Sequence, residues 1–296
     1  MSILSKIPIL INAIHGYAIK WRWDVFGIGN IEPLVRRTDG QPELVVSLTS
    51  YGRRVQTGVV YYCLVSILKQ TERPNRLILT LTDKEEVIPE KLKNLEMYGV
   101  EIQYSEDIRS YKKLIPILRQ CPDDIIVTID DDVIYNSRLL EILMNNYEHN
   151  KTAIHSMNSS RPVLRNGEVA TYKEWPLAED GETGLHVFSI GVNSVLYPPH
   201  CLHSDVFDKE TFMKLCPMAD DIWFWLQAVR NGTRHQNIIN NGVVNYSFDA
   251  LYQYLHKGSA LTHSNRFENA NDKQLAALIE HYGMKKDILR ILSNQE

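Results

Sequence analysis

The stretch Ile125-Ile-Val-Thr-Ile-Asp-Asp-Asp132 decides the fold that we expect. Residues 125–129 are almost wholly apolar, which is typical of a strand buried on both faces of a sheet. The three carboxylates that follow repel one another, so they cost free energy unless a cationic group lies beside them. If the strand alternation continues, Asp130 and Asp132 point together while Asp131 points away. The stretch therefore predicts a cation site at the end of a central strand.

The segments around this stretch predict the rest of the architecture. Strand patterns occur at 44–49, 76–82 and 100–104, and helix patterns occur at 57–70, near 88–98, at 110–120 in broken form, and after a cap at Asn136 or Ser137. Such alternation is typical of a parallel sheet with helices on its faces. Later residues predict a long loop or hairpin at 157–184, a strand at 185–197, and helices at 222–230 and 272–292. We expect an α/β fold with a mostly parallel central sheet, helices on both faces and an irregular C-terminal half.

The composition and the N-terminal segment limit the partners. The chain has 296 residues and a net charge of -4, which gives no basic footprint for nucleic acid. The four cysteines are far apart and form no C-x-x-C pair, so reduced thiols are expected. Residues 1–42 form an N-terminal extension with a helical pattern and no stretch long enough to span a membrane. This extension either packs on the domain's own core or lies on a membrane surface as an amphipathic segment.

Three further groups of residues are candidates for chemistry. Asp220 and Asp221 precede the apolar helix at 222–230, where an acid either caps the helix or serves as a general base. Trp223, in the aromatic run beside them, suits a sugar-binding wall, although buried aromatics are more often core. The basic candidates for a phosphate are Arg53 and Lys113, because both precede or follow strands near the same end of the sheet. A late histidine, His263, is the candidate to complete a metal shell.

Four pieces of the sequence together resemble the family-2-like GT-A glycosyltransferases of bacterial polysaccharide gene clusters. Residues 46–51, Val-Ser-Leu-Thr-Ser-Tyr, are similar to the first strand and its nucleotide-contacting turn, and residues 66–71, Ser-Ile-Leu-Lys-Gln-Thr, to the helix end that follows. Residues 129–132 are similar to the DXD motif, and Ala-Asp-Asp at 219–221 resembles the acidic pair that supplies the base in inverting members. The similarity covers residues 44–232.

The resemblance implies a nucleotide-diphosphate sugar donor, with UDP as the expected nucleotide, and a Mn²⁺ or Mg²⁺ ion. Asp132 would then bind the metal directly, Asp130 would contact the ribose or the metal, and His263 would complete the metal shell. Asp221, or its neighbour Asp220, would be the catalytic base. The residues expected to contact substrate are Thr49, Tyr51, Arg53, Asp83, Lys113, Asp130, Asp131, Gly191, Asn193 and Trp223.

The resemblance also implies that two parts of the chain bind different substrates. Residues 43–150 would bind the nucleotide sugar, and residues 151–296 of the same domain would bind a saccharide or lipid-linked saccharide acceptor. The expected location is the cytoplasm, at the inner face of the membrane if the N-terminal extension lies there. Two alternatives stay open: a haloacid-dehalogenase-like phosphatase, whose acidic motif normally opens the domain, and a non-catalytic carbohydrate-binding module.

Overall fold

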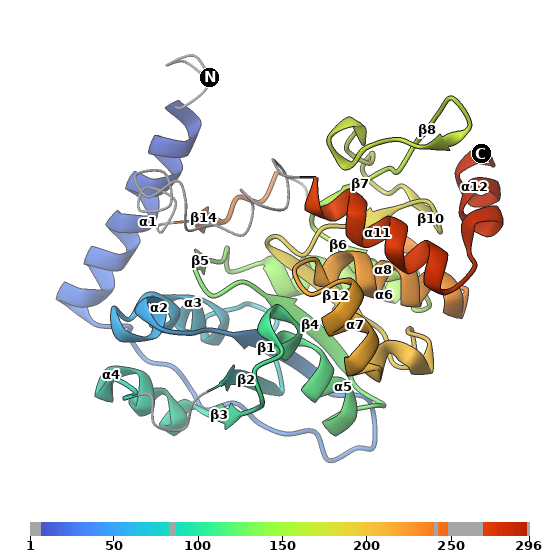
Figure 1. Ribbon diagram of the computed structural model, residues 1–296. Helices are drawn as coiled ribbons and strands as arrows, with labels where there is room; N and C mark the ends of the chain where they lie inside the picture. Colours follow the sequence, from blue (N-terminus) through green and yellow to red (C-terminus); the bar gives the residue numbers. More distant parts are fainter. Residues whose placement is uncertain (1–6, 83–86, 240–241, 248–268, 295–296) are drawn as a thin grey trace.

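The structure of the protein, a computed structural model, describes residues 7–82, 87–239, 242–247 and 269–294 (Figure 1). Over these residues the central sheet has eight strands in the order β10-β13-β6-β12-β4-β1-β2-β3. In chain order they are β1 (Leu44–Thr49), β2 (Arg76–Leu81), β3 (Val100–Tyr104), β4 (Ile125–Ile129), β6 (Ile154–Ser156), β10 (Thr183–Gly184), β12 (Ser194–Tyr197) and β13 (His235–Asn237). The four strands β1 to β4 are parallel, and β6 and β13 share their direction. Only β12 and β10 run the opposite way within this sheet.

The central strands contribute side chains to two separate cores, because alternate residues of a strand point to opposite faces. In β1, Val46 belongs to one core and Val45 to the other, and in β4, Val127 and Ile126 divide in the same way. Over the first face lie α3 (Val59–Leu68) and α6 (Leu139–His149), and over the second lie α5 (Ile115–Gln120), α7 (Lys209–Leu215) and α8 (Asp220–Asn231). The predicted α/β class, with a mostly parallel sheet covered on both faces, is confirmed.

Most elements before the acidic stretch agree with their predicted ranges. Strands β3 and β4 match 100–104 and 125–129, and β2 ends one residue before the predicted 82. The predicted helices appear as α2 (Arg53–Gln56) with α3, as α4 (Glu90–Lys93) with the 3₁₀ helix η2 (Asn94–Tyr98), and as η3 (Arg109–Lys113) with α5. The predicted cap of α6 is wrong, because Arg138 holds that position and neither neighbour caps the helix. The Asn136 side chain instead accepts a hydrogen bond from the Arg138 N–H at 3.0 Å.

The second half contributes small sheets and the remaining helices. The loop or hairpin predicted at 157–184 contains a hairpin whose turn residues, Asn166 and Gly167, both have positive φ. The strand predicted at 185–197 divides into β11, in a small sheet, and β12, in the central sheet. The small strands are β5 (Val133–Ile134), β7 (Ser159–Ser160), β8 (Leu164–Arg165), β9 (Glu168–Val169), β11 (Phe188–Ser189) and β14 (Tyr246–Ser247). The short helices are η4 (Tyr172–Glu174) and η5 (Ser204–Phe207), and the C-terminal helices are α11 (Ala270–His281) and α12 (Lys285–Ser293).

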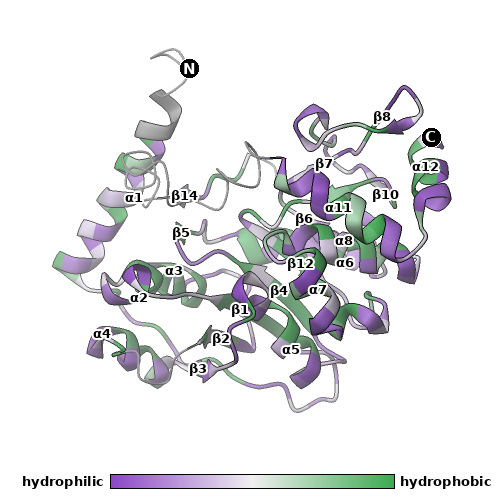
Figure 2. Ribbon diagram, in the orientation of Figure 1, coloured by the Kyte–Doolittle hydropathy of each residue, from purple (hydrophilic) through white to green (hydrophobic). Residues whose placement is uncertain are grey.

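Helix α1 (Ile7–Phe26) stands at one side of the molecule, beside β14 (Figure 1). Hydrophobic residues fill the central sheet, whereas α1 carries both hydrophobic and polar residues along its length (Figure 2). No helix among the described residues is long and apolar enough to cross a membrane. All four cysteines are buried and free, which agrees with the expected absence of disulfides.

Candidate active site

The acidic triplet lies at the point where the strand order of the sheet reverses. From β1 the chain proceeds outward through β2 and β3, then returns to place β4 on the other side of β1. In open α/β sheets, ligands bind beyond the carboxyl ends of the strands at such a switch point. Ser50 follows β1 and Asp131 follows β4, and the Ser50 hydroxyl donates to the Asp131 carboxylate at 2.6 Å. The two strand ends therefore meet at this edge.

Arg54, in the short helix α2, supplies the cationic group that the triplet requires. Its guanidinium pairs with the Asp131 carboxylate and, through Nη2, with Asp132 Oδ2 at 2.8 Å. Both carboxylates are buried, and burial raises the pKa of Asp131 even though Arg54 opposes that effect. The sequence predicted Arg53 as a phosphate contact, and the structure shows its neighbour Arg54 paired with these two acids.

The predicted alternation within the triplet does not hold. Strand β4 ends at Ile129, and a turn begins at Asp131, so the two-residue period of a strand no longer applies. As a result Asp131 and Asp132 converge on Arg54. The first acid, Asp130, instead accepts a hydrogen bond from the backbone N–H of Asn193 at 2.9 Å.

A hydrogen-bond network through Tyr135 holds Asp130 between the end of β4 and the start of β12. The Asp130 N–H donates to the Tyr135 hydroxyl at 2.8 Å, and that hydroxyl donates to the Asn193 carbonyl at 2.6 Å. Asn193 has a left-handed φ of 74° and immediately precedes β12. The Tyr135 ring is buried, so this network fixes the turn after β4 against the turn before β12. Sequence reasoning did not find Tyr135, because nothing in its local pattern separates it from an ordinary core residue.

A second acidic group, from the start of α8, faces the triplet across Lys113. The Lys113 ammonium lies 3.3 Å from Asp220 Oδ2, and both side chains are buried. Gly191 lies against this group, since a Cβ there would clash with Asp221 Oδ1 and would lie 3.0 Å from Lys113 Nζ. The Asp221 carboxylate accepts the Gly191 N–H. The backbone thus approaches the acids as closely as only a glycine permits.

The titration of these groups follows from burial and mutual charge. Burial raises the pKa of Asp221 to about 7, the Asp220 charge adds to this effect, and Lys113 opposes it. Burial alone would lower the pKa of Lys113, but Asp220, Asp221 and Asp130 together raise it above its ordinary value. Burial also raises the pKa of Asp130 against the opposing charge of Lys113. Asp130, Lys113 and Asp221 therefore belong to one electrostatic cluster.

Three other predicted residues lie on the β1 side of the site. The Thr49 hydroxyl donates to the Thr80 carbonyl at 2.8 Å, which holds β1 against β2. Tyr51, which lies between β1 and α2, is 65% exposed. Arg53 is the first residue of α2, and its side chain is half-buried. Two predicted residues, Asp83 and His263, lie outside the described residues.

The prediction that Trp223 forms a sugar-binding wall is wrong. Its side chain is fully buried and packs edge-on against Phe212, with ring centroids 5.6 Å apart. The indole N–H donates to the Val206 carbonyl at 3.2 Å, so its polar group is also satisfied inside the protein. The aromatic run of α8 is core, and it fixes the acids at the start of the helix.

The acidic corner carries oxygen ligands of the kind that divalent cations prefer. Mg²⁺ and Mn²⁺ favour oxygen ligands, and Mg²⁺ is usually held by one or two carboxylates together with substrate phosphates. Asp132 supplies a carboxylate of this kind beside Arg54, whereas the Asp130 carboxylate accepts the Asn193 N–H. Among the described residues no group of three potential ligands forms a complete cage. The donor set therefore fits an ion that a ligand's phosphates would help to hold.

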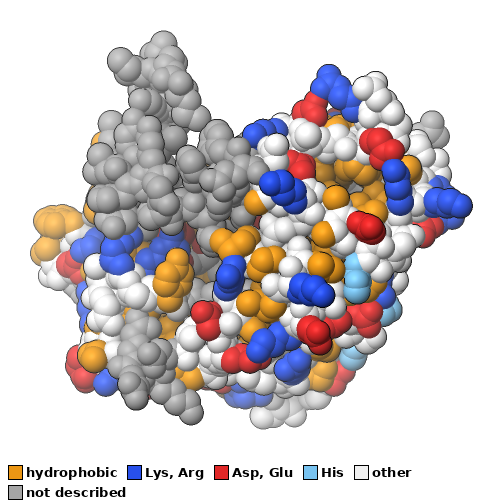
Figure 3. Space-filling view, in the orientation of Figure 1, with side chains coloured by type: hydrophobic (Ala, Val, Ile, Leu, Met, Phe, Trp, Pro, Cys, Tyr) orange, Lys and Arg blue, Asp and Glu red, His pale blue; other side chains and the backbone are white. Residues whose placement is uncertain are grey.

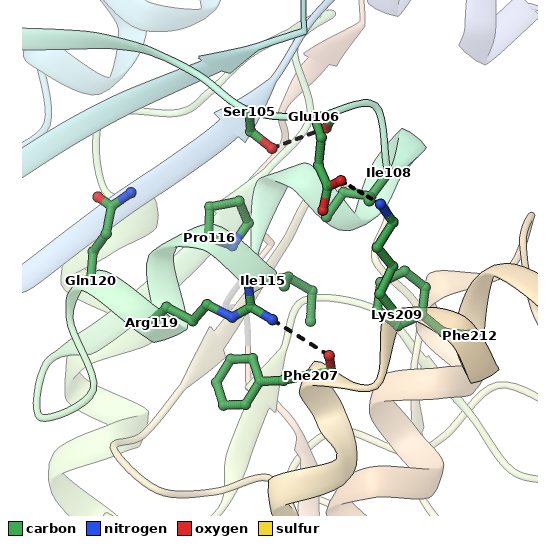
Figure 4. Close-up of a pocket in the computed structure, with 10 residues that line it drawn as sticks. All are labelled: Ser105, Glu106, Ile108, Ile115, Pro116, Arg119, Gln120, Phe207, Lys209 and Phe212. Carbon is green, nitrogen blue, oxygen red and sulfur yellow. Dashed lines mark hydrogen bonds and ion pairs between the residues drawn. The ribbon is translucent and has the colours of Figure 1, made fainter.

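A separate cavity of about 250 Å³ lies between α5 and the segment from η5 to α7 (Figure 4). Arg119 and Phe207 face one another there, with the Lys209–Glu106 ion pair at one edge (Figure 4). None of the predicted site residues lines this cavity. It is a feature of the helix layer and not part of the acidic site.

Comparisons with known proteins do not identify a family for the chain. No protein-family model matches the chain, and no curated protein sequence matches it significantly. Solved structures of similar arrangement include CMP:2-keto-3-deoxy-manno-octonic acid synthetase complexed with CTP, with 10% identity over 74% of this chain and 98% of that chain, and a TM-score of 0.40. TarS of S. aureus has 13% identity over 83% of this chain and 73% of that chain, with a TM-score of 0.49.

A third similar structure is the mannosyltransferase PcManGT from Pyrobaculum calidifontis, in complex with GDP-Man and Mn²⁺. It has 12% identity over 54% of this chain and 45% of that chain, with a TM-score of 0.34. At such identities a likeness concerns the path of the chain and not its chemistry. The arrangement of the site's own residues is therefore what bears on the function.

Proposed function

We propose that the protein is a glycosyltransferase that moves a sugar from a nucleotide-diphosphate donor to a hydroxyl of a saccharide or lipid-linked saccharide. The observation that carries this proposal is the meeting of two acidic groups around Lys113 at the switch point of the sheet. One group follows a central strand, and the other begins a helix from the second half of the chain. The group after the strand would lie beside an anionic donor, and the group at the start of the helix would supply a base.

The donor diphosphate would lie over the triplet. Arg54, with its side chain 28% exposed, and Lys113 offer positive charge on either side of the acids. Asp132, with Asp130, would hold a divalent ion there together with diphosphate oxygens. Such an ion, when bound, neutralises charge that develops on the leaving diphosphate. Thr49, Tyr51 and the turn after β1 would lie around the nucleoside, for which UDP is the first choice.

Asp221 is the proposed general base. Its raised pKa of about 7 suits a carboxylate that takes a proton near neutral pH. The acceptor hydroxyl would lose its proton to Asp221 while its oxygen forms a bond to the anomeric carbon of the donor. The bond from that carbon to the diphosphate oxygen breaks, and the diphosphate leaves with the electron pair. Attack from the face opposite the leaving group inverts the anomeric centre.

Gly191 and Asn193 would border the donor sugar. Gly191 allows the backbone to approach Asp221, and Asn193 fixes Asp130 through its N–H. Asp220 would act through Lys113, since their ion pair holds the ammonium beside Asp221. The position of the triplet after the fourth strand distinguishes the site from a phosphatase nucleophile, which would open the domain.

A thermal-shift screen of the full chain tests the proposal. UDP-, GDP-, CMP- and TDP-sugars are each added with and without Mn²⁺, and hydrolysis or transfer of the best donor is then measured. We expect at least one nucleotide-diphosphate sugar to raise the melting temperature more in Mn²⁺ than without it. Failure of every nucleotide sugar to stabilise the protein, combined with hydrolysis of simple phosphate esters, would favour the phosphatase alternative.

A further inference from the structure

Helix α1 presents one continuous apolar face to solvent. Ile11, Ile14, Ala18, Trp21 and Val25 are all exposed and recur at intervals of three and four residues, which places them on one stripe of the helix. Ile14 is 57% exposed and Trp21 is 60% exposed, so large apolar side chains lie together on this one helix face. Figure 3 shows hydrophobic side chains protruding at the left edge of the molecule, over the C-terminal end of this helix.

The opposite face of α1 is already occupied by the body of the protein. Trp23 stacks on Tyr62, with ring centroids 6.4 Å apart, and Asn12 donates to the Asn245 carbonyl at 2.8 Å. Asp24 accepts hydrogen bonds from Tyr62 at 2.6 Å and from Lys91 at 2.8 Å. The apolar stripe is therefore not the face by which α1 attaches, and the attachment holds the stripe in a fixed orientation.

The charge along this segment has one sign. Residues 1–23 contain Lys6, Lys20 and Arg22 and no acidic residue, in a chain whose net charge is -4. The first acid of the sequence, Asp24, is turned toward the body, where Lys20 also pairs with it at 2.6 Å. Arg22 is exposed beside the stripe. A partner for this face should accordingly carry negative charge next to an apolar layer.

A second copy of the chain fits this face poorly. Stripes with this spacing pair as coiled coils when charges of both signs flank them. Here the exposed flank of the stripe offers Arg22 and aromatic side chains, so two copies would bring like charges together. Tryptophan and tyrosine are instead enriched where an apolar layer meets water, as at the surface of a lipid bilayer.

We propose that the exposed face of α1 binds the surface of an anionic lipid bilayer. Ile14, Trp21 and Val25 would enter the headgroup boundary, while Arg22 contacts the lipid phosphates. The helix would lie in the plane of the surface, since no described helix can cross the bilayer. This surface is independent of the proposed transfer reaction.

The position of α1 gives this contact a consequence for the acidic site. Val133 and Ile134 of β5 follow Asp132 directly, and β5 pairs with β14, against which α1 packs. The His15 ring stacks on Tyr246 of β14 at 5.7 Å between centroids. A bilayer under α1 would therefore lie on the side of the molecule where the triplet ends.

Sedimentation of the full chain with vesicles tests this proposal without any donor or acceptor. Phosphatidylcholine vesicles are compared with vesicles that also contain phosphatidylglycerol. We expect partition onto the anionic vesicles only, with a loss of roughly tenfold or more in the double variant Ile14→Ser/Trp21→Ser, because two apolar side chains no longer enter the bilayer. Arg22→Glu changes the charge by two and should weaken partition roughly tenfold.

The matched control is Met97→Ser/Leu177→Ser, which removes two apolar side chains that are 68% and 74% exposed on other parts of the surface. It should bind vesicles as the unchanged protein does, and circular dichroism should show that both double variants are folded. Absence of vesicle binding by the unchanged protein, or equal binding by the α1 variant, would overturn the proposal. So would a stable dimer that Ile14→Ser/Trp21→Ser converts to monomer. None of these outcomes depends on glycosyl transfer.

Discussion

Arg54 Nη2 lies 2.8 Å from Asp132 Oδ2, at the end of the strand that carries the acidic triplet. The same guanidinium pairs with Asp131, so one side chain of α2 compensates two buried carboxylates that follow strand β4. The protein thereby supplies its own cation at the place where the sequence predicted one. The stability of the protein at this corner and the affinity of the corner for other cations should therefore depend on the same two carboxylates.

Replacing Arg54 by alanine should destabilise the protein by about 2 kcal/mol. The change leaves Asp131 and Asp132 buried without their shared cation, and the partial exposure of Arg54 keeps the loss below that of a fully buried pair. Urea unfolding measures this difference. Addition of Mn²⁺ should restore more stability to Arg54→Ala than it adds to the unchanged protein.

The exposed ion pair of Arg138 with Glu141 provides the control for that experiment. Arg138→Ala should change the unfolding free energy by less than about 0.5 kcal/mol, because surface pairs contribute little. If Arg54→Ala were no less stable than Arg138→Ala, the compensating role of Arg54 would be wrong.

Asp132→Ala should abolish the metal-dependent part of donor binding. The variant removes the carboxylate expected to hold the ion, while the nucleoside contacts near β1 are untouched. Titration calorimetry with the donor found in the thermal-shift screen, in Mn²⁺ and in chelator, measures the change. Asp123→Ala, an exposed acid before the other end of β4, should leave both affinities unaltered. Equal donor affinity of Asp132→Ala and the unchanged protein in Mn²⁺ would contradict the metal role.

Asp221→Asn should retain donor binding and lose transfer by roughly 10²–10⁴-fold, the usual contribution of a general base. In the unchanged protein kcat should rise with pH through about 7, because Asp221 acts only when ionised. Steady-state rates between pH 5 and pH 9 (about two units on either side of that pKa) measure both effects. A variant that keeps the rate and the pH profile would remove Asp221 from the mechanism.

The same substitution should stabilise the protein at alkaline pH. A carboxyl whose pKa rises on folding stabilises the folded state at low pH, and this stabilisation is lost as pH increases through about 7. Asparagine carries no such charge to desolvate and still accepts the Gly191 N–H. At pH 8 Asp221→Asn should therefore melt about 2–4 °C above the unchanged protein, with no increase at pH 4. Calorimetric scans at the two pH values would reveal any departure from this pattern.

Gly191→Ala should impair transfer more than it impairs stability. Its new methyl group would press on Asp221 and Lys113, so the base would be displaced from the acceptor hydroxyl. We expect kcat to fall by roughly 10²-fold, as small misplacements at a reacting centre do. Gly167→Ala strains a positive φ in the distant β8–β9 hairpin and serves as the control with lower stability and normal kcat. Similar kcat values for the two variants would refute the close approach at Gly191.

Local sequence patterns predicted those strands and helices whose own residues show a clear strand or helix pattern. The apolar run of β4 and the strand β3 need no distant partner to be recognised, and the helix of residues 222–230 was evident from its period and its terminal glycine. Tertiary packing determined what the patterns left open. Trp223 is core because Phe212 covers it, and no property of the aromatic run distinguishes a covered face from a sugar-binding one.

The residues that meet at the acidic corner were predicted in part for a similar reason. Asp130 to Asp132, Lys113 and Asp221 were proposed from their residue types and their places near strand or helix ends, and the structure brings them close together. Ser50 and Tyr135 were not singled out, and Arg53 was preferred to its neighbour Arg54, because these contacts depend on how a turn orients a side chain. The alternation expected for the triplet assumed a strand that in fact ends at Ile129.

The antiparallel register of β12 on β4 determines when the site can form. Ser194 pairs with Ile129, and this pairing brings the Asn193 N–H to the Asp130 carboxylate, two residues that are 63 positions apart in the sequence. Contacts between such distant residues form slowly, because the loop between them must first be closed. The nascent first half alone holds its acids without this restraint. We therefore expect assembly of the site to be a late event of folding, and residues 43–150 alone should not hold Asp130 as the whole chain does.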